Sequence, residues 1–177
     1  MHVNIYIETS ITGPSSRRAA GAWLVEYIKA SGDIETRGGI LYADRTMENE
    51  LALYLIIRSV SILTKTCCVR VFTECRHVLN TMNNHWLPQW QKNGWINKKN
   101  KPVRNAEAWE KCAGLFGRHM MEWTDACHEY RICMQDRIRK ELRKEHGLPD
   151  YGIYVDIVVR EWNTKICRRD ELSKINQ

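Results

Sequence analysis

Residues 85–109 read HWLPQWQKNGWINKKNKPVRNAEAW, a stretch that combines four tryptophans with lysines, an arginine and several asparagines. Its only acid, Glu107, comes near the far end. Flat aromatic rings embedded in positive charge favour a polyanionic partner, although a lysine run is equally well a solvated loop. The rest of the chain has to decide between these two interpretations.

The composition fits one soluble domain. A chain of 177 residues, 44% hydrophobic and 27% charged, can bury one good core and an appendage. No apolar run approaches ~20 residues, and the N-terminal MHVNIYIETS lacks the regions of a signal peptide. The seven cysteines are odd in number and form no paired CxxC units, so we expect reduced thiols and a cytoplasmic location. The net charge of +6 again favours polyanionic partners.

Hydrophobic periodicity predicts an α/β arrangement without internal repeats. Runs that are alternating or continuously apolar predict strands at 2–8, 20–28, 34–42, 67–74 and 118–125. Apolar residues at helical spacing predict helices at 46–63, 75–84, 104–116 and 134–146. The first helix has no glycine or proline and carries Glu48 and Glu50 in its first turn, where the helix dipole tolerates negative charge.

Two predicted strands end in a glutamate, in IYIETS at 5–10 and VFTECR at 71–76. A third acid, Glu50, opens the intervening helix, so adjacent strands would bring these carboxylates together at the rim of a sheet. Clustered carboxylates repel unless a cation lies between them, and oxygen-only ligand sets suit Mg²⁺ or Mn²⁺. Two such ions are the usual device for in-line displacement at a phosphodiester. Taken singly, each acid is better explained as a solvated residue, and it is their joint order that favours a site.

In that order the segments resemble ribonuclease H of the type-1 class. The corresponding pieces are IYIETS at 5–10, MENELA at 47–52, FTEC at 72–75 and MQDRI at 134–138. The most specific match is Trp86, Trp90 and Trp95, followed by Lys101-Pro102-Val103-Arg104-Asn105 and Trp109. The resemblance runs from about residue 2 to residue 143.

The resemblance implies a ribonuclease H-like mixed five-stranded sheet flanked by helices, with a basic handle at about 84–106. In that family the handle lies along the DNA strand of an RNA/DNA hybrid, where lysines meet phosphates and ring faces pack on sugars. The residues that it assigns to the nucleic acid are Trp90, Trp95, Lys92, Lys98, Lys99, Lys101, Arg104, Asn105 and Thr46. Trp86 and Trp109 are expected to be core anchors of the handle helices instead.

The metal-binding set that the resemblance implies departs from the family pattern. Glu8, Glu50, Glu74 and Asp136 would hold two Mg²⁺ or Mn²⁺ ions, but the family has Asp at the positions of Glu8 and Glu74. The extra methylene moves each carboxylate by ~1 Å, enough to slow a reaction that needs near-attack geometry. Asp125, which also ends a strand, is an alternative to Asp136.

The loop before the last helix and the residues before the first helix depart further. His128 is the only histidine available for the family's catalytic histidine, and the other interpretation is an ordinary polar loop residue. Arg45-Thr46-Met47 replaces the family's Thr-Asn-Asn run, so two asparagines that read base edges are absent.

The sequence therefore predicts a ribonuclease H-like domain at 1–146 and a C-terminal extension at 147–177 that contains a possible added strand and a possible protein or oligomer contact. The expected function is a metal-dependent endonuclease that cuts the RNA strand of RNA/DNA hybrids. The alternatives are a nucleic-acid-binding module with weakened or absent catalysis, and a related nuclease for double-stranded RNA or junctions.

Overall fold

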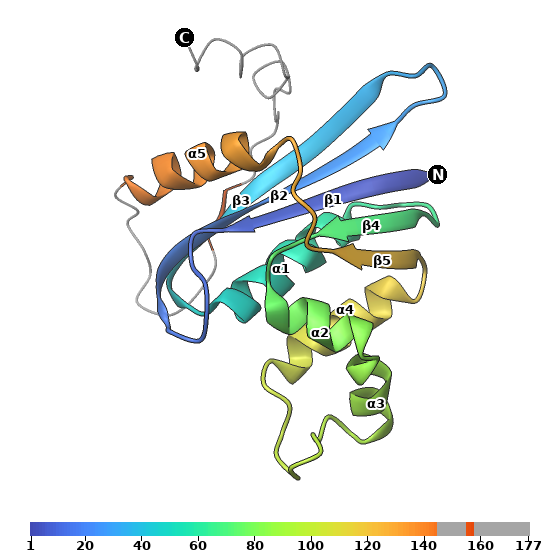
Figure 1. The fold of residues 1–177 in the computed structure, drawn as a ribbon, viewed down its shortest axis with the longest axis vertical. Coiled ribbons are helices and arrows are strands. Elements are labelled where there is room, and N and C mark those ends of the chain that lie inside the picture. Colours follow the sequence, from blue (N-terminus) through green and yellow to red (C-terminus); the bar gives the residue numbers. More distant parts are fainter. Residues whose placement is uncertain (145–154, 158–177) are drawn as a thin grey trace.

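A single mixed sheet forms the centre of the molecule in this computed structural model, which describes residues 1–144 and 155–157 (Figure 1). The strand order is β5-β4-β1-β2-β3-β6. An antiparallel meander consists of β1 (His2–Thr9), β2 (Arg17–Ile28) and β3 (Ile34–Thr46). Beyond it, β4 (Cys68–Phe72) pairs parallel to β1, and β5 (Met120–Thr124) pairs parallel to β4. The predicted five-stranded mixed sheet is confirmed, and β6 (Val155–Ile157) adds a sixth strand beside β3.

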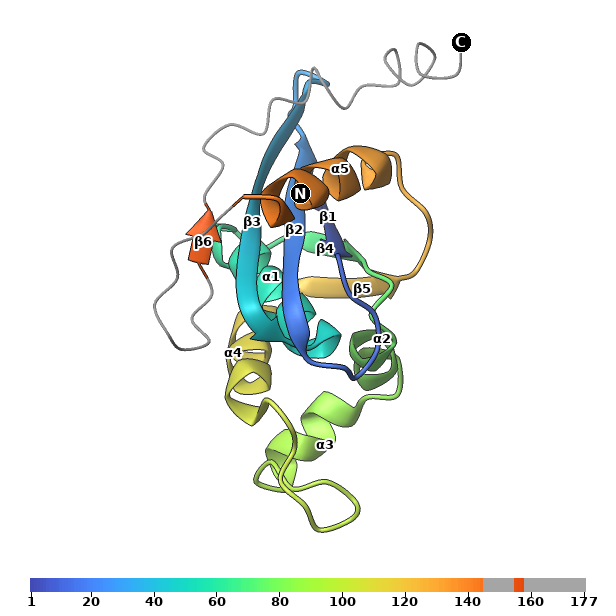
Figure 2. The same cartoon turned by 90° about the vertical axis from the view of Figure 1, so that its left-hand side faces the viewer.

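Helices lie on both faces of the sheet (Figures 1 and 2). One face carries α1 (Glu48–Ser61), α2 (Arg76–Asn83) and α4 (Ala106–Phe116), and the other carries α5 (Arg131–Leu142). The short α3 (Trp86–Lys92) lies in a protrusion beyond α2 and α4. No helix among residues 1–144 is both long and apolar enough to cross a membrane.

Strand β1 is buried on both faces and therefore divides two hydrophobic cores. Val3, Ile5 and Ile7 belong to the core beneath α1 and α4. Tyr6, on the opposite face, packs in the second core with Met134 and Ile138 of α5. The strict alternation along β1 thus holds a helical layer on each side of the same strand.

The boundaries of two helices differ from those predicted. The chain forms α3 within the handle, where no helix was expected, and α5 begins at Arg131 instead of at 134. Its N-cap, Tyr130, makes no side-chain capping bond, so no local start signal marks the helix in the sequence.

Five cysteines of the described chain are free thiols, but Cys133 on α5 is disulfide-bonded. The expectation of seven reduced cysteines is therefore wrong for Cys133. Of the extension predicted at 147–177, only β6 (Val155–Ile157) is described, and it pairs antiparallel with β3. The remainder lies outside the described residues.

Gly21 on β2 lies where the sheet packs closely against α1. A Cβ built on Gly21 would lie 2.5 Å from Leu55 Cδ1 and 3.0 Å from the backbone oxygen of Glu8. Any side chain there would press on the strand that carries Glu8 and on the helix that packs beneath it.

Gly21→Ala should therefore destabilise the fold by about 1–3 kcal/mol through overpacking. Gly114→Ala is the matched control, because Gly114 lies in α4 and an added Cβ there meets no atom within 4 Å. That control should raise stability by up to about 1 kcal/mol, since alanine is the better helix former. Chemical denaturation measures both, and equal stability of the two variants would contradict the packing described.

Candidate active site and nucleic-acid handle

Glu8 and Glu74 lie at the same end of two neighbouring parallel strands. The register pairs Tyr6 of β1 with Phe72 of β4, and each glutamate follows two residues later. The Glu8 side chain is 5% exposed and that of Glu74 is 53% exposed. One carboxylate is therefore enclosed by protein, and the other borders solvent.

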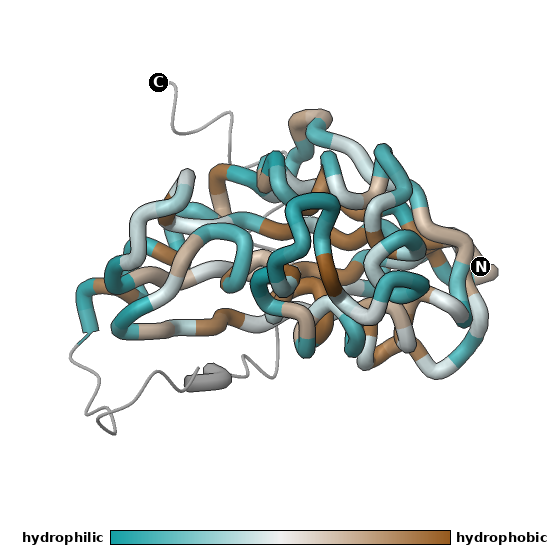
Figure 3. Tube along the Cα trace, turned by 90° about the horizontal axis from the view of Figure 1, so that it is seen from below, coloured by the Kyte–Doolittle hydropathy of each residue, from teal (hydrophilic) through white to brown (hydrophobic). Residues whose placement is uncertain are grey.

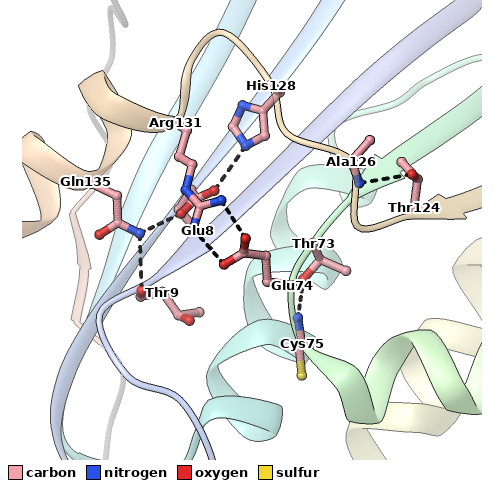
Figure 4. A network of polar contacts seen from close by, with 10 residues as sticks. All are labelled: Glu8, Thr9, Thr73, Glu74, Cys75, Thr124, Ala126, His128, Arg131 and Gln135. Atoms are coloured by element: carbon pink, nitrogen blue, oxygen red, sulfur yellow. Dashed lines mark hydrogen bonds and ion pairs between the residues drawn. The ribbon is translucent and has the colours of Figure 1, made fainter.

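One segment of the chain, the loop before α5 and its first two turns, supplies the partners of both carboxylates (Figure 4). His128 Nε2 lies 3.0 Å from Glu8 Oε1, and the side-chain amide of Gln135 donates to Glu8 Oε2. Arg131 donates from both terminal nitrogens to the two oxygens of Glu74, with Nη2 at 2.8 Å. The hydrogen bond to Glu74 and the nearby charge of Glu8 raise the pKa of Arg131. Its guanidinium thus interacts with Glu74 through hydrogen bonds and with Glu8 through charge.

A buried anchor behind these contacts fixes where α5 begins. The hydroxyls of Tyr130 and Tyr6 both donate to the carboxylate of Glu26, which is 7% exposed. Burial and the adjacent Glu26 raise the pKa of both tyrosines, so they stay protonated as donors. The Tyr6 ring also lies 4.6 Å from the His128 ring, centroid to centroid. His128 therefore packs against the same group of residues, Tyr6, Tyr130 and Glu26.

The two acids in the first turn of α1 have different surroundings. Glu48 accepts a hydrogen bond from the backbone nitrogen of Gly13 at 2.6 Å, and its charge reaches Cys75, directly after Glu74. Burial is the main cause that raises the pKa of Cys75, to about 11, and the Glu48 charge adds to it. Glu50 instead accepts from the Thr46 hydroxyl at 3.1 Å, and its charge reaches Tyr54 one turn later. Of the two, Glu48 lies toward the strand ends.

The remaining acids predicted for the site do not contact Glu8 or Glu74. Asp136 pairs with Lys140 of its own helix at 2.7 Å, a hydrogen bond that lowers its pKa, and its side chain is 46% exposed. The physical reason is the side on which α5 packs, since its buried residues are Met134, Ile138 and Glu141 and Asp136 lies on a more exposed side. Asp125 follows β5 and is exposed. Thr46 is buried, with its hydroxyl committed to Glu50 and Met47.

The donor chemistry at the strand ends suits a divalent cation, but the present arrangement does not. Carboxylate oxygens of Glu8, Glu48 and Glu74 are the hard ligands that Mg²⁺ and Mn²⁺ prefer. In this conformation, however, the carboxylate oxygens already have partners. The Gln135 amide and the His128 imidazole contact Glu8, and the Arg131 guanidinium contacts Glu74. Within the described part of the chain, no three His, Cys, Asp or Glu side chains are grouped closely enough to hold a metal ion. A bound ion would first have to displace these partners.

The protruding segment joins the domain through stacked aromatic rings. The Trp90 ring lies 5.7 Å from Trp109 and 6.1 Å from Trp86, and His77 stacks on Trp90 at 6.4 Å. Trp109 is fully buried, whereas Trp90 and Trp95 are partly buried against the main core. The prediction that Trp109 anchors the handle agrees with this burial, and Trp90 shares the anchoring role.

The basic side chains of the handle face solvent. Those assigned to the nucleic acid from the sequence are all exposed, namely Lys92, Lys98, Lys99, Lys101 and Arg104. Figure 3, viewed from the handle end, shows a largely hydrophilic loop nearest the viewer. Beside the loop, Trp86, Trp90, Ile96 and Lys98 help to line a pocket of about 430 Å³. Asn105 differs, because its side-chain nitrogen is buried and without a hydrogen bond in the described structure.

Three residues of this site escaped prediction from the sequence. For Glu48 a signal existed, since it directly follows Met47 as in the family's Met-Glu-Leu motif. Arg131 and Gln135 had no such signal, because their role depends on the helix start that Tyr130 and Glu26 set through tertiary contacts.

Comparison with known proteins identifies the family. The RNase H family model matches residues 1–126, which include β1 to β5 and the handle but end before α5. Ribonuclease HI of Neisseria meningitidis serogroup B is 33% identical over 105 residues, 59% of this chain and 70% of that protein. Ribonuclease H of Lachnoclostridium phytofermentans is 29% identical over 119 residues, 67% of this chain and 75% of that protein.

Solved structures show the same fold. LC9-RNase H1, described as a type 1 RNase H with the type 2 active-site motif, superposes with a TM-score of 0.65 at 22% identity, covering 97% of this chain and 83% of that one. A foamy viral protease-reverse transcriptase in complex with an RNA/DNA hybrid superposes with a TM-score of 0.59 at 12% identity, covering 80% of this chain and 20% of that one.

The chain belongs to the ribonuclease H family. It is a nuclease of the hydrolase class, which acts on phosphodiester bonds, and members of this family generally use divalent metal ions.

Tyr130→Phe tests the anchor behind the site. Removing the hydroxyl leaves buried Glu26 with one donor fewer, so we expect a loss of about 1–3 kcal/mol of unfolding free energy. Tyr27→Phe is the control, because it removes a hydroxyl bond to Glu35 on an exposed part of the β2–β3 hairpin and should have much less effect. If the two variants unfold at the same denaturant concentration, Tyr130 does not hold α5 in place.

Proposed function

We propose that this nuclease hydrolyses the RNA strand of RNA/DNA hybrids at a centre that takes two Mg²⁺ or Mn²⁺ ions. The observation that carries the proposal is the pair Glu8 and Glu74, two strand-end carboxylates that a single arginine bridges by hydrogen bond and charge. Two neighbouring carboxylates repel unless a cation offsets their charge, and this chain belongs to a family of nucleases that use divalent ions.

Glu8, Glu48 and Glu74 are the acids that we assign to the centre. On the contacts described, Glu48 takes the place predicted for Glu50, and Gln135 is the residue of α5 that reaches Glu8 in place of Asp136. Bound ions would supply an activated water and stabilise the leaving 3′ oxygen. His128, with Nε2 at Glu8, is placed to exchange a proton at that carboxylate.

The handle is assigned to the DNA strand of the hybrid. Its exposed lysines and Arg104 offer charge to phosphates, and the partly buried Trp90 and Trp95 offer ring surface to deoxyribose, which lacks a 2′-hydroxyl. Arg104 also lies 3.6 Å from Met47 Sδ, so it connects the handle to the start of α1, beside Glu48.

A second candidate is a hybrid-binding nuclease whose hydrolysis is slow. The observation that favours it is the occupation of Glu8 and Glu74 by His128, Gln135 and Arg131. Incubating the purified chain with labelled hybrid, duplex RNA and duplex DNA, each with Mg²⁺ and with Mn²⁺, separates the two candidates. Tight binding of hybrid without product would favour the second.

Glu74→Gln should abolish hydrolysis, by at least ~10²-fold, and leave hybrid binding intact or tighter, because repulsion between the carboxylate and phosphate is removed. Glu48→Gln and Glu50→Gln form a matched pair two residues apart, and only the first should behave like Glu74→Gln. Asp136→Asn should retain activity. Single-turnover cleavage and equilibrium binding measure these effects, and loss of cleavage in Glu50→Gln alone would return that role to Glu50.

Changing Lys98, Lys99 and Lys101 together to alanine should weaken hybrid binding and make the slope of log K against log salt shallower by roughly 0.7–0.9 for each phosphate that these lysines neutralise. Turnover at saturating hybrid should change little, because the loop lies away from Glu8 and Glu74. The control is Lys29→Ala at the far β2–β3 hairpin, where Lys29 pairs with Glu35 at 2.7 Å. An unchanged salt slope in the triple variant would show that these lysines neutralise no phosphate and belong to a solvated loop.

A further inference from the structure

We propose that Arg131 sets the metal affinity of this centre, because it is an internal cation that a divalent ion must displace from Glu74. The inference rests on the proposed function in one respect, since it takes Glu8 and Glu74 as metal ligands. It adds a residue of this chain that determines how much metal the centre requires.

The bidentate geometry makes Arg131 and a metal ion competitors for Glu74. Both terminal nitrogens of the guanidinium donate to Glu74, one to each carboxylate oxygen. A divalent ion needs lone pairs of the same oxygens, and paired charge-assisted bonds of this kind are the stronger ones in proteins. The side chains of Arg131 and Glu74 are 39% and 53% exposed, so an ion can approach from solvent.

The position of Arg131 is set by the fold, which distinguishes it from a mobile surface arginine. It is the first residue of α5, and the preceding Tyr130 is tied to buried Glu26. One turn later Gln135 holds Glu8 and the backbone oxygen of Thr9. The guanidinium therefore projects from a helix whose position is held by contacts both before and after Arg131.

The charge balance gives the direction of the effect. With Arg131 present, its positive charge offsets one of the two carboxylates at the strand ends. Without it, Glu8 and Glu74 keep their negative charges and lose their shared cation, so the field that attracts a divalent ion becomes stronger. A chain without Arg131 should bind metal more tightly.

The test is calorimetric titration of Mn²⁺ into the purified full chain in the absence of nucleic acid. Arg131→Gln should bind Mn²⁺ up to about fivefold more tightly than the unaltered chain, the equilibrium factor that a partly exposed ion pair is worth. Its thermal midpoint should also rise more on addition of Mn²⁺. Arg139→Gln is the matched control on the same helix, since Arg139 is exposed and faces Asp136, and it should leave the affinity unchanged.

Two further variants keep the test decisive. Arg131→Lys retains the charge without the two-pronged bond, and it should bind Mn²⁺ with intermediate affinity even if Arg131→Gln folds poorly. In a Glu74→Gln background, Arg131→Gln should give a smaller gain, because the competing bidentate pair no longer exists and only the positive charge near Glu8 is removed. Equal or weaker Mn²⁺ binding by both Arg131 variants, or a full gain in the Glu74→Gln background, would overturn the inference.

The outcome is separable from that of the proposed function. Tighter Mn²⁺ binding by Arg131→Gln, together with no cleavage of hybrid by any variant, would support the role of Arg131 and reject hybrid hydrolysis. Cleavage of hybrid by the unaltered chain, together with an unchanged affinity in Arg131→Gln, would do the reverse.

Discussion

The parallel pairing of β1 with β4 is the constraint on which the site depends. Parallel neighbours end at the same edge, so the register that joins Tyr6 to Phe72 also brings Glu8 level with Glu74. Parallel strands need a long crossover, and here β2, β3 and α1 provide it, so that α1 starts at the same edge and brings Glu48 with it. Two like charges held at one edge by backbone hydrogen bonds cannot move apart, and they have to be neutralised from elsewhere.

In this structure the neutralising groups come from α5, whose placement depends on a buried carboxylate. Glu26 accepts from Asn4, Tyr6 and Tyr130, which satisfies a charge that would otherwise be costly to bury. The cluster lies on the face of the sheet that α5 covers. A polar network inside the second core thereby decides which side chains reach the carboxylates.

Much of this fold could be predicted from the sequence, because it is built on local patterns. Alternation identified β1, and an uninterrupted apolar period identified α1. The neighbouring positions of Glu8 and Glu74 could be predicted because each follows directly from the end of a strand. Glu48 and Glu50 are about 200° apart around a helix, so the sequence pattern alone does not decide which of the two lies on the side of the strand ends. The helix that carries Asp136 was expected to begin three residues late, because its start depends on the contact between Tyr130 and Glu26 and on no local signal.

The handle has a consequence for the thermodynamics of association. The Asn97 side chain accepts from the backbone nitrogens of Lys99 and Lys101, and an isolated bridge between Ile96 and Pro102 closes the loop. Together with the Trp90 to Trp109 ring contact, these bonds order the basic loop before any partner arrives. A preformed loop loses less conformational entropy on docking than a disordered basic segment of equal charge. More of the electrostatic attraction is thus retained as affinity, and long-lived complexes become possible with a modest number of phosphate contacts.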